Sequence, residues 1–121
     1  MEGARHRGSH YEGVAARYLQ SRGVTIIERN VYSRGGEIDL IGIDKNVLVF
    51  FEVRFRKLGG LVDPISSVTP NKQRRLLRAV AFYLHRHGQW DAVARIDVVG
   101  ITPGSTSQYR VQWVKNAIQA D

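Results

Sequence analysis

Two apolar runs separated by a short polar break constrain the fold of this chain more than any other feature of its sequence. Residues 36–43 and 47–56 are rich in β-branched and aromatic side chains, and a polar stretch at 44–46 separates them. Strand-length runs around a tight break are typical of an antiparallel β-hairpin. We therefore expect residues 36–56 to form a hairpin.

Carboxylates interrupt both runs at positions where a strand usually packs apolar side chains. Because side chains repeat every two residues along a strand, Glu37 and Asp39 share a face of the first strand. In the second strand Glu52 shares a face with Arg54, and the odd-numbered residues of 47–55, all apolar, take the other face. The hairpin therefore presents acidic groups from both of its strands.

The length of the hairpin loop decides whether two of these acids meet. A loop of two or four residues around 45–46 places Asp39 directly opposite Glu52. A loop of three residues would place Ile38 there and turn Asp39 to the other face. Asn46 tolerates a left-handed backbone, so the sequence permits each of these loops. We favour the loops of two and four residues.

Two like charges directly opposed in a strand pair are destabilising unless a cation lies between them. Magnesium binds through one or two carboxylates together with waters and substrate phosphates, and it leaves coordination positions open for chemistry. We therefore expect Asp39 and Glu52 to bind a divalent metal ion. The alternative is that both acids lie on a solvated face and pair with Arg34, Arg54 or Arg56.

Composition limits the class of protein. At 121 residues and 13.7 kDa, the chain has the length of one domain with a single core. No apolar run reaches the roughly 18 residues that a membrane span requires, and the first residues contain no apolar signal region. The absence of cysteine excludes disulfides, thiolate zinc sites and cysteine nucleophiles. We expect a cytoplasmic protein that does not act at a membrane.

Positive charge dominates the chain and is concentrated in one predicted helix. The formal net charge of +7 and the pI of about 10.2 favour polyanionic partners, nucleic acid first. The helix opens with Thr69 as N-cap and Pro70, and no acid occurs between Thr69 and Gln89 to neutralise its surface. The cations that we expect to contact a phosphate backbone are Lys72, Arg74, Arg75 and Arg78. A merely solvated basic face is the alternative.

Hydrophobic periodicity and turn residues place the remaining elements. A helix between Ser9 as N-cap and Gly23 precedes a strand at 24–32, and strands at 93–101 and 108–114 follow the basic helix. We expect the first of these later strands to join the sheet through a right-handed crossover, and the last to lie at an edge. The expected organisation is a frayed or disordered segment at 1–7, one domain at 8–117 and a tail at 118–121.

Glu12 has two interpretations. It stands three residues after Ser9, which is the spacing of a helix capping box, and a cap would be a sufficient structural role. The alternative is that it leans over the hairpin as an auxiliary metal ligand. The sequence leaves both interpretations open.

The chain resembles the YraN family, which comprises small uncharacterised bacterial proteins with a restriction-endonuclease-like fold. The resemblance rests on pieces that run in the family's order over almost the whole chain. These pieces are Gly8, Tyr11-Glu12, Ala15-Ala16, Tyr18-Leu19, Arg29-Asn30, Gly36 to Ile41, Phe51 to Arg54 with Arg56, Lys72 with Arg74-Arg75, Tyr83-Leu84, and Arg95 to Val98.

This resemblance implies an α/β (α+β) fold of one domain, in which helices flank a mixed β-sheet. It also implies a nuclease site of the D…E-x-K kind, as in archaeal Holliday-junction resolvases. By position, Asp39 and Glu52 would hold the metal ion. Glu12, the backbone carbonyl of Val53 and, as an auxiliary neighbour, Glu37 would complete the site.

Arg54 stands where the nuclease motif has lysine. A lysine can lose its proton in a desolvated site, whereas arginine, with a pKa above about 12, keeps it. Arg54 can therefore neutralise charge on a phosphate but cannot act as a general base. Because a metal ion lowers the pKa of bound water by itself, hydrolysis does not require the lysine. Lys72, on the next helix, could also take its place in space.

The resulting prediction is a Mg²⁺- or Mn²⁺-dependent endonuclease that acts on DNA. Asp39, Glu52 and Arg54 would carry the chemistry, and Arg56 and Lys57 would join the basic helix in contacting the backbone. Recognition would follow DNA structure more than sequence, because phosphate contacts carry little base information. Branched or junction DNA would suit a homodimer.

Two alternatives remain. One is a nucleic-acid-binding protein of the same fold whose chemistry has lapsed with the motif lysine. The other is a protein-interaction module whose basic helix meets an acidic partner.

Overall fold

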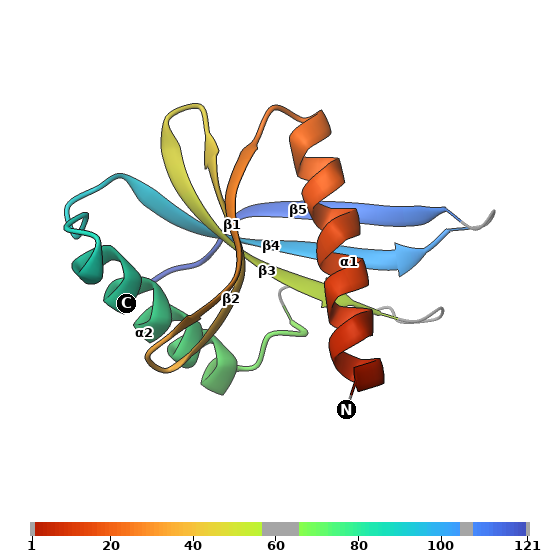
Figure 1. Cartoon of the computed structure of the whole chain (residues 1–121), viewed down its shortest axis with the longest axis horizontal. Helices are drawn as coiled ribbons and strands as arrows, with labels where there is room; N and C mark the ends of the chain where they lie inside the picture. Colours follow the sequence, from red (N-terminus) through yellow and green to blue (C-terminus); the bar gives the residue numbers. More distant parts are fainter. Residues whose placement is uncertain (1, 57–65, 105–107, 121) are drawn as a thin grey trace.

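A five-stranded sheet forms the centre of the computed structural model, which describes residues 2–56, 66–104 and 108–120. The elements are α1 (Glu2–Ser21), β1 (Thr25–Ser33), β2 (Gly36–Asp44), β3 (Val47–Phe55), α2 (Pro70–Arg86), β4 (Ala94–Pro103) and β5 (Tyr109–Ile118). The strands lie in the order β1-β2-β3-β4-β5, and all neighbours are antiparallel except the parallel pair β3–β4 (Figure 1). The sheet is mixed, as predicted, and β5 lies at an edge.

The central hairpin closes with a loop of two residues, Lys45 and Asn46, whose φ angles of 49° and 70° are both left-handed. Such a turn matches the right-handed twist of the strands that it joins. The pairing between β2 and β3 continues to Leu40 opposite Phe51. The two-residue loop is one of the two favoured loop lengths, both of which predict this register, and it brings Asp39 beside β3.

The second helix begins as predicted and the first does not. The Thr69 side chain accepts a hydrogen bond from the Lys72 backbone N–H at 3.2 Å, and Pro70 starts α2. By contrast, α1 begins at Glu2, so Ser9 lies inside the helix and the predicted capping box is wrong. No proline occurs before Ser9 to stop the helix. Within the described residues, neither helix combines the length and the apolar content that crossing a membrane requires.

Two hydrophobic cores, one on each face of the sheet, hold the helices. Phe50 of β3 and Val98 of β4 belong to the core under α2, whereas their neighbours Phe51 and Val99 belong to the core under α1. The alternation predicted for the second hairpin strand is therefore confirmed. The helices cover opposite faces of the sheet, as expected for an α+β domain with a mixed sheet between helices (Figure 1).

An ion network ties β4 to β5. Arg95 Nε donates to the Asp97 carboxylate at 3.0 Å. Asp97 is fully buried, and it also accepts hydrogen bonds from the Trp113 indole and the Asn116 backbone N–H, both at 2.8 Å. The other end of Arg95 donates to Asp44 at 2.6 Å. The β2–β3 turn is thereby linked to the two C-terminal strands.

Candidate metal centre

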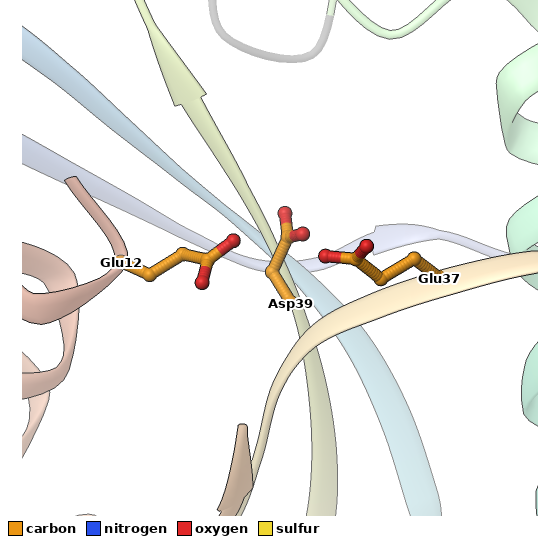
Figure 2. A group of neighbouring side chains, drawn as sticks. All are labelled: Glu12, Glu37 and Asp39. Carbon is orange, nitrogen blue, oxygen red and sulfur yellow. The ribbon is translucent and has the colours of Figure 1, made fainter. Parts of the chain in front are cut away.

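Three carboxylates converge from two elements. Glu12 comes from α1, Glu37 and Asp39 come from β2, and their side chains point toward one another (Figure 2). One carboxylate oxygen of each lies within 4.8 Å of the other two. Two oxygens bonded to one Mg²⁺ ion at about 2.1 Å are at most about 4.2 Å apart. Small rotations would therefore let all three carboxylates share an ion.

A break in the side-chain alternation of β2 positions Asp39. Ile38 and Ile41 both belong to the core under α2, and Leu40 belongs to the opposite core, whereas a regular strand would place Ile38 with Leu40. At this break the Asp39 carboxylate accepts a hydrogen bond from the Val53 backbone N–H at 2.8 Å. Asp39 is thus fixed between β2 and β3 by a side-chain bond to the neighbouring strand.

Glu52 lies against Asp39. The two carboxyl groups share a hydrogen bond, and Arg54 Nη1 lies 3.5 Å from Glu52 Oε2. Burial raises the pKa of Glu52, although the Asp39 hydrogen bond and the charges of Arg54 and Lys72 oppose this change. Burial, together with the charge of Glu52, raises the pKa of Asp39 to about 9. The two acids predicted to meet therefore do meet.

Glu12 is buried because it lies on the apolar stripe of α1, with Ala15, Ala16 and Leu19. Only 8% of it is exposed, and its Oε1 atom accepts no hydrogen bond from any residue that the structure describes. Burial raises its pKa, and the nearby charge of Glu37 adds to the effect. The helix carries this acid into the site rather than using it as a cap.

Burial is the main cause of the raised pKa values of Glu12, Asp39 and Glu52, and neighbouring acids add to it, so the described residues do not fully compensate these groups when they are ionised. A divalent cation would supply the missing positive charge, and carboxylate oxygens are the ligands that Mg²⁺ and Mn²⁺ prefer. The buried, unpartnered Oε1 of Glu12 is the atom for which the described residues provide least compensation. The donor set therefore fits a hard divalent cation.

Arg54 is held by the segment that leads into α2. Its Nε donates to Ser67 Oγ and its Nη2 to the Ser67 backbone carbonyl, both at 3.2 Å. Its Nη1 faces Glu52. Because all three guanidinium nitrogens have partners, Arg54 orients Glu52 and anchors the start of α2.

The predicted phosphate-binding cations fall into two groups. Lys72 and Arg75 line a cavity of about 160 Å³ together with Glu37 and Glu52, directly beside the acids. The others are Arg74 and Arg78, exposed on α2, Arg56, partly buried after β3, and Lys57, which lies outside the described residues. Only the first group is brought to the acidic site.

Asn30 and Ser67 contribute to the site although the sequence did not predict them as site residues. Asn30 donates a side-chain hydrogen bond to Glu12, and its φ of 52° places a left-handed residue across from Asp39. An asparagine inside a strand pattern is a signal for such an irregularity. Ser67, which binds Arg54, has no comparable signal, because serine is ordinary in a connecting segment.

Fold and site together define a small α+β domain with a carboxylate-lined candidate metal centre. The model of the uncharacterised protein family UPF0102 matches residues 11–101. The chain belongs to this family, which is the YraN family that its motifs indicate.

The relatives are matched over nearly their whole length. A UPF0102 protein of Marinobacter nauticus is 72% identical over 120 residues, which cover 99% of this chain and 98% of the relative. A UPF0102 protein of Coxiella burnetii is 42% identical over 115 residues, which cover 94% of this chain and 92% of the relative. Neither name states an activity.

Two solved structures are similar at a lower level. One is a repair endonuclease from Pyrococcus abyssi, with a TM-score of 0.44 and 19% identity over 81% of this chain and 39% of that chain. The other is Pyrococcus furiosus SfsA in complex with Ca²⁺, with a TM-score of 0.43 and 12% identity over 97% of this chain and 65% of that chain. This chain spans less than two thirds of each, and likeness at this level transfers no activity.

Proposed function

We propose that this protein is a divalent-metal-dependent nuclease that hydrolyses phosphodiester bonds in DNA. The observation that carries the proposal is the convergence of Glu12, Glu37 and Asp39, with a buried carboxylate oxygen left without a partner among the described residues. Burying acids together is costly unless a cation compensates them. A cation held by carboxylates beside a basic helix suits an anionic, phosphate-containing substrate.

The side chains have distinct tasks in this proposal. Mg²⁺ or Mn²⁺, when bound, would supply Lewis acidity, lowering the pKa of a bound water and offsetting phosphate charge. Glu12, Glu37 and Asp39 would hold the ion through carboxylate oxygens. Glu52, in contact with Asp39 and oriented by Arg54, adds a fourth acid to the set. Arg54 cannot act as a general base, because it keeps its proton.

Contact with DNA would come from the cations around the acids. The net charge is +7, and α2 carries the exposed Arg74 and Arg78 beside Lys72 and Arg75. Arg56 and Lys57 extend the predicted contact along the chain after β3. Because these groups would bind phosphates, we propose recognition of DNA structure, including branched or junction DNA bound by a homodimer, rather than of base sequence.

A cleavage assay tests the proposal. Labelled duplex, forked and four-way-junction DNA would be incubated with Mn²⁺ or Mg²⁺ and with wild type, Asp39→Ala and Glu52→Ala. We expect metal-dependent cleavage by wild type and its loss in both variants. Cleavage that persists unchanged in both variants would indicate a contaminating nuclease and would contradict the proposal.

The contacts of Arg54 favour a second candidate function: a protein of the same fold that binds DNA without cleaving it. The Arg54 guanidinium is fully engaged by Ser67 and Glu52 at the position where the motif has lysine. Such a protein would bind DNA with an affinity that falls steeply with salt but would show no cleavage. Arg54→Lys would then be the variant to examine for restored cleavage.

A further inference from the structure

The cavity beside the acids is lined by both acidic and basic side chains. Glu37 and Glu52 of the sheet and Lys72 and Arg75 of α2 line it, together with Gly35 of the β1–β2 turn and Gly36 at the start of β2. The turn lies close against α2, since a Cβ atom on Gly35 would be 3.3 Å from the Arg78 Cβ. At about 160 Å³, the cavity is smaller than the roughly 300–1,000 Å³ of sites that enclose drug-sized ligands. A single phosphoryl group has the right size, and Lys72 and Arg75 are the lining residues that would attract its negative charge.

Arg54, which stands at the position of the motif lysine, does not line this cavity. The Nε and Nη2 atoms of Arg54 bind Ser67 at 3.2 Å. Its remaining nitrogen, Nη1, faces Glu52 at 3.5 Å. To reach a phosphate, Arg54 would have to give up its bonds to the segment that precedes α2.

The Lys72 side chain, unlike that of Arg54, is not held by an ion pair with any residue that the structure describes. It is exposed in the first turn of α2. Its ammonium group is close enough to Glu52 to oppose the rise in the pKa of that acid. The first turn of α2 contains no acid, so nothing on the helix itself competes for the ammonium group. Lys72 therefore faces the acids with its charge available.

We propose that Lys72, with Arg75 beside it, forms the phosphoryl-binding wall of the site and replaces the lysine that the nuclease motif carries at the position of Arg54. The inference rests on the proposed nuclease function and names the residue that would touch the reacting phosphate. In the hydrolysis, a water oxygen bonds to phosphorus, one P–O ester bond breaks with its electron pair leaving on the ester oxygen, and one water proton ends on that oxygen. Lys72 stays protonated, forms no covalent bond, and offsets the negative charge on the phosphoryl oxygens.

A binding experiment tests this wall without relying on cleavage. Inorganic phosphate would be titrated into the Mg²⁺-loaded protein while the backbone amide resonances of Gly35 and Gly36 are followed by NMR. We expect saturable shifts in wild type, weakening of at least about tenfold in Lys72→Met, and partial recovery in Lys72→Arg. Arg86→Met removes an exposed charge from the other end of the same helix and should bind phosphate as wild type does.

A kinetic experiment with the same variants tests the catalytic role. Lys72→Met should lower kcat by about 10²–10³-fold, the usual effect of losing one transition-state charge partner. Its KM for duplex DNA should rise by no more than the weakening seen with inorganic phosphate, its Mn²⁺ affinity should change less than about threefold, and Lys72→Arg should recover part of kcat. Because Lys72 is exposed, its Tm should stay that of wild type. Arg54→Met should instead lower Tm.

The outcomes separate this inference from the proposed function. If wild type never cleaves DNA but its phosphate binding depends on Lys72, the nuclease function fails and the phosphoryl-binding wall stands. If Lys72→Met binds phosphate as wild type does, or if Arg54→Met rather than Lys72→Met abolishes phosphate binding, the inference is overturned.

Discussion

Asp39 is subject to opposing influences on its ionisation. Burial and the adjacent charge of Glu52 favour the protonated acid, while the hydrogen bond from the Val53 N–H favours the carboxylate. Burial dominates, because the pKa is raised to about 9 from an ordinary value of 3.8. Without a cation, the folded protein must therefore take up a proton on Asp39 at neutral pH, which costs stability because the unfolded chain leaves this acid ionised. Metal binding would remove that cost.

Replacing Asp39 by asparagine should stabilise the metal-free protein at pH 7. The amide oxygen can still accept the Val53 N–H, and the folded variant no longer has to take up a proton at this position. We expect a gain of about 1–3 kcal/mol, the usual scale for relieving an uncompensated buried group. Urea unfolding in EDTA measures it.

The pH dependence of the Asp39→Asn effect follows from the sign of the pKa change. A raised pKa means that the folded state binds a proton more tightly than the unfolded state does. The contribution of Asp39 to stability should therefore be fully present below about pH 4 and be lost as the pH rises toward 9, so the stability of the variant relative to metal-free wild type should increase over this range. Equal pH dependence of the two proteins, or a destabilised variant at pH 7, would contradict this account of Asp39.

At the scale of elements, the approach of β1 to β2 depends on a missing side chain. A Cβ atom on Gly42 would lie 2.9 Å from the Thr25 carbonyl oxygen and 2.9 Å from Val24 Cγ1. The strand pair that carries Asp39 and Glu37 therefore requires glycine here. By contrast, a Cβ on Gly13 of α1 would lie 3.6 Å from Arg17 Nη1, which is an ordinary contact.

These two glycines form a matched pair of alanine substitutions. Gly42→Ala should destabilise the protein by about 1–3 kcal/mol through overpacking. Gly13→Ala should stabilise it by about 0.5–1 kcal/mol, because alanine is the better helix residue. Thermal unfolding of both variants tests the comparison, and a neutral Gly42→Ala would show that β1 does not lie as close to β2 as described.

The link between the β2–β3 turn and β4 should be sensitive to acid. The hydrogen bond from Arg95 holds the pKa of Asp44 below its ordinary value, and Lys115 adds to the effect. A depressed pKa contributes stability that is present above about pH 4 and is lost as the pH falls further. Asp44→Asn should therefore cost up to about 1 kcal/mol at pH 7 and less than that near pH 2.

Denaturation curves at both pH values measure this difference. Asp91→Asn, an exposed acid with no ion pair among the described residues, is the control and should cost little at either pH. A cost for Asp44→Asn that does not shrink in acid would show that the contribution is not the ion pair.

At the scale of the whole molecule, local patterns predicted most of the architecture. Alternation in 47–55 predicted the hairpin and its two faces, because side chains repeat every two residues. The register was favoured but not determined, because Asn46 also permits a loop of three residues. The start of α2 was predicted correctly because the cap depends only on local residues: the Thr69 side chain accepts a hydrogen bond from the Lys72 N–H. The start of α1 was wrong because a good capping pattern at Ser9 does not prevent a helix from extending before it.

The site was less predictable than the fold because it depends on how distant elements cross. The burial of Glu12 and its approach to Glu37 follow from the position of α1 over the sheet, which no spacing in the sequence encodes. The break in the side-chain alternation of β2 at Asp39 also depends on tertiary packing, because Ile38 and Leu40 lie in opposite cores. β5 extends to Ile118, beyond the predicted end at 114, because Ile118 is buried in the core under α2.

The proposed function requires Glu12, Glu37 and Asp39 to bind one divalent cation. A crystal of the protein soaked in Mn²⁺, with diffraction recorded to reveal anomalous scattering, tests this most directly. We expect one strong anomalous peak within about 2.1–2.3 Å of carboxylate oxygens from these residues in wild type, and none in Asp39→Asn. A wild-type map with no peak at these carboxylates, or a peak that persists in Asp39→Asn, would contradict the account.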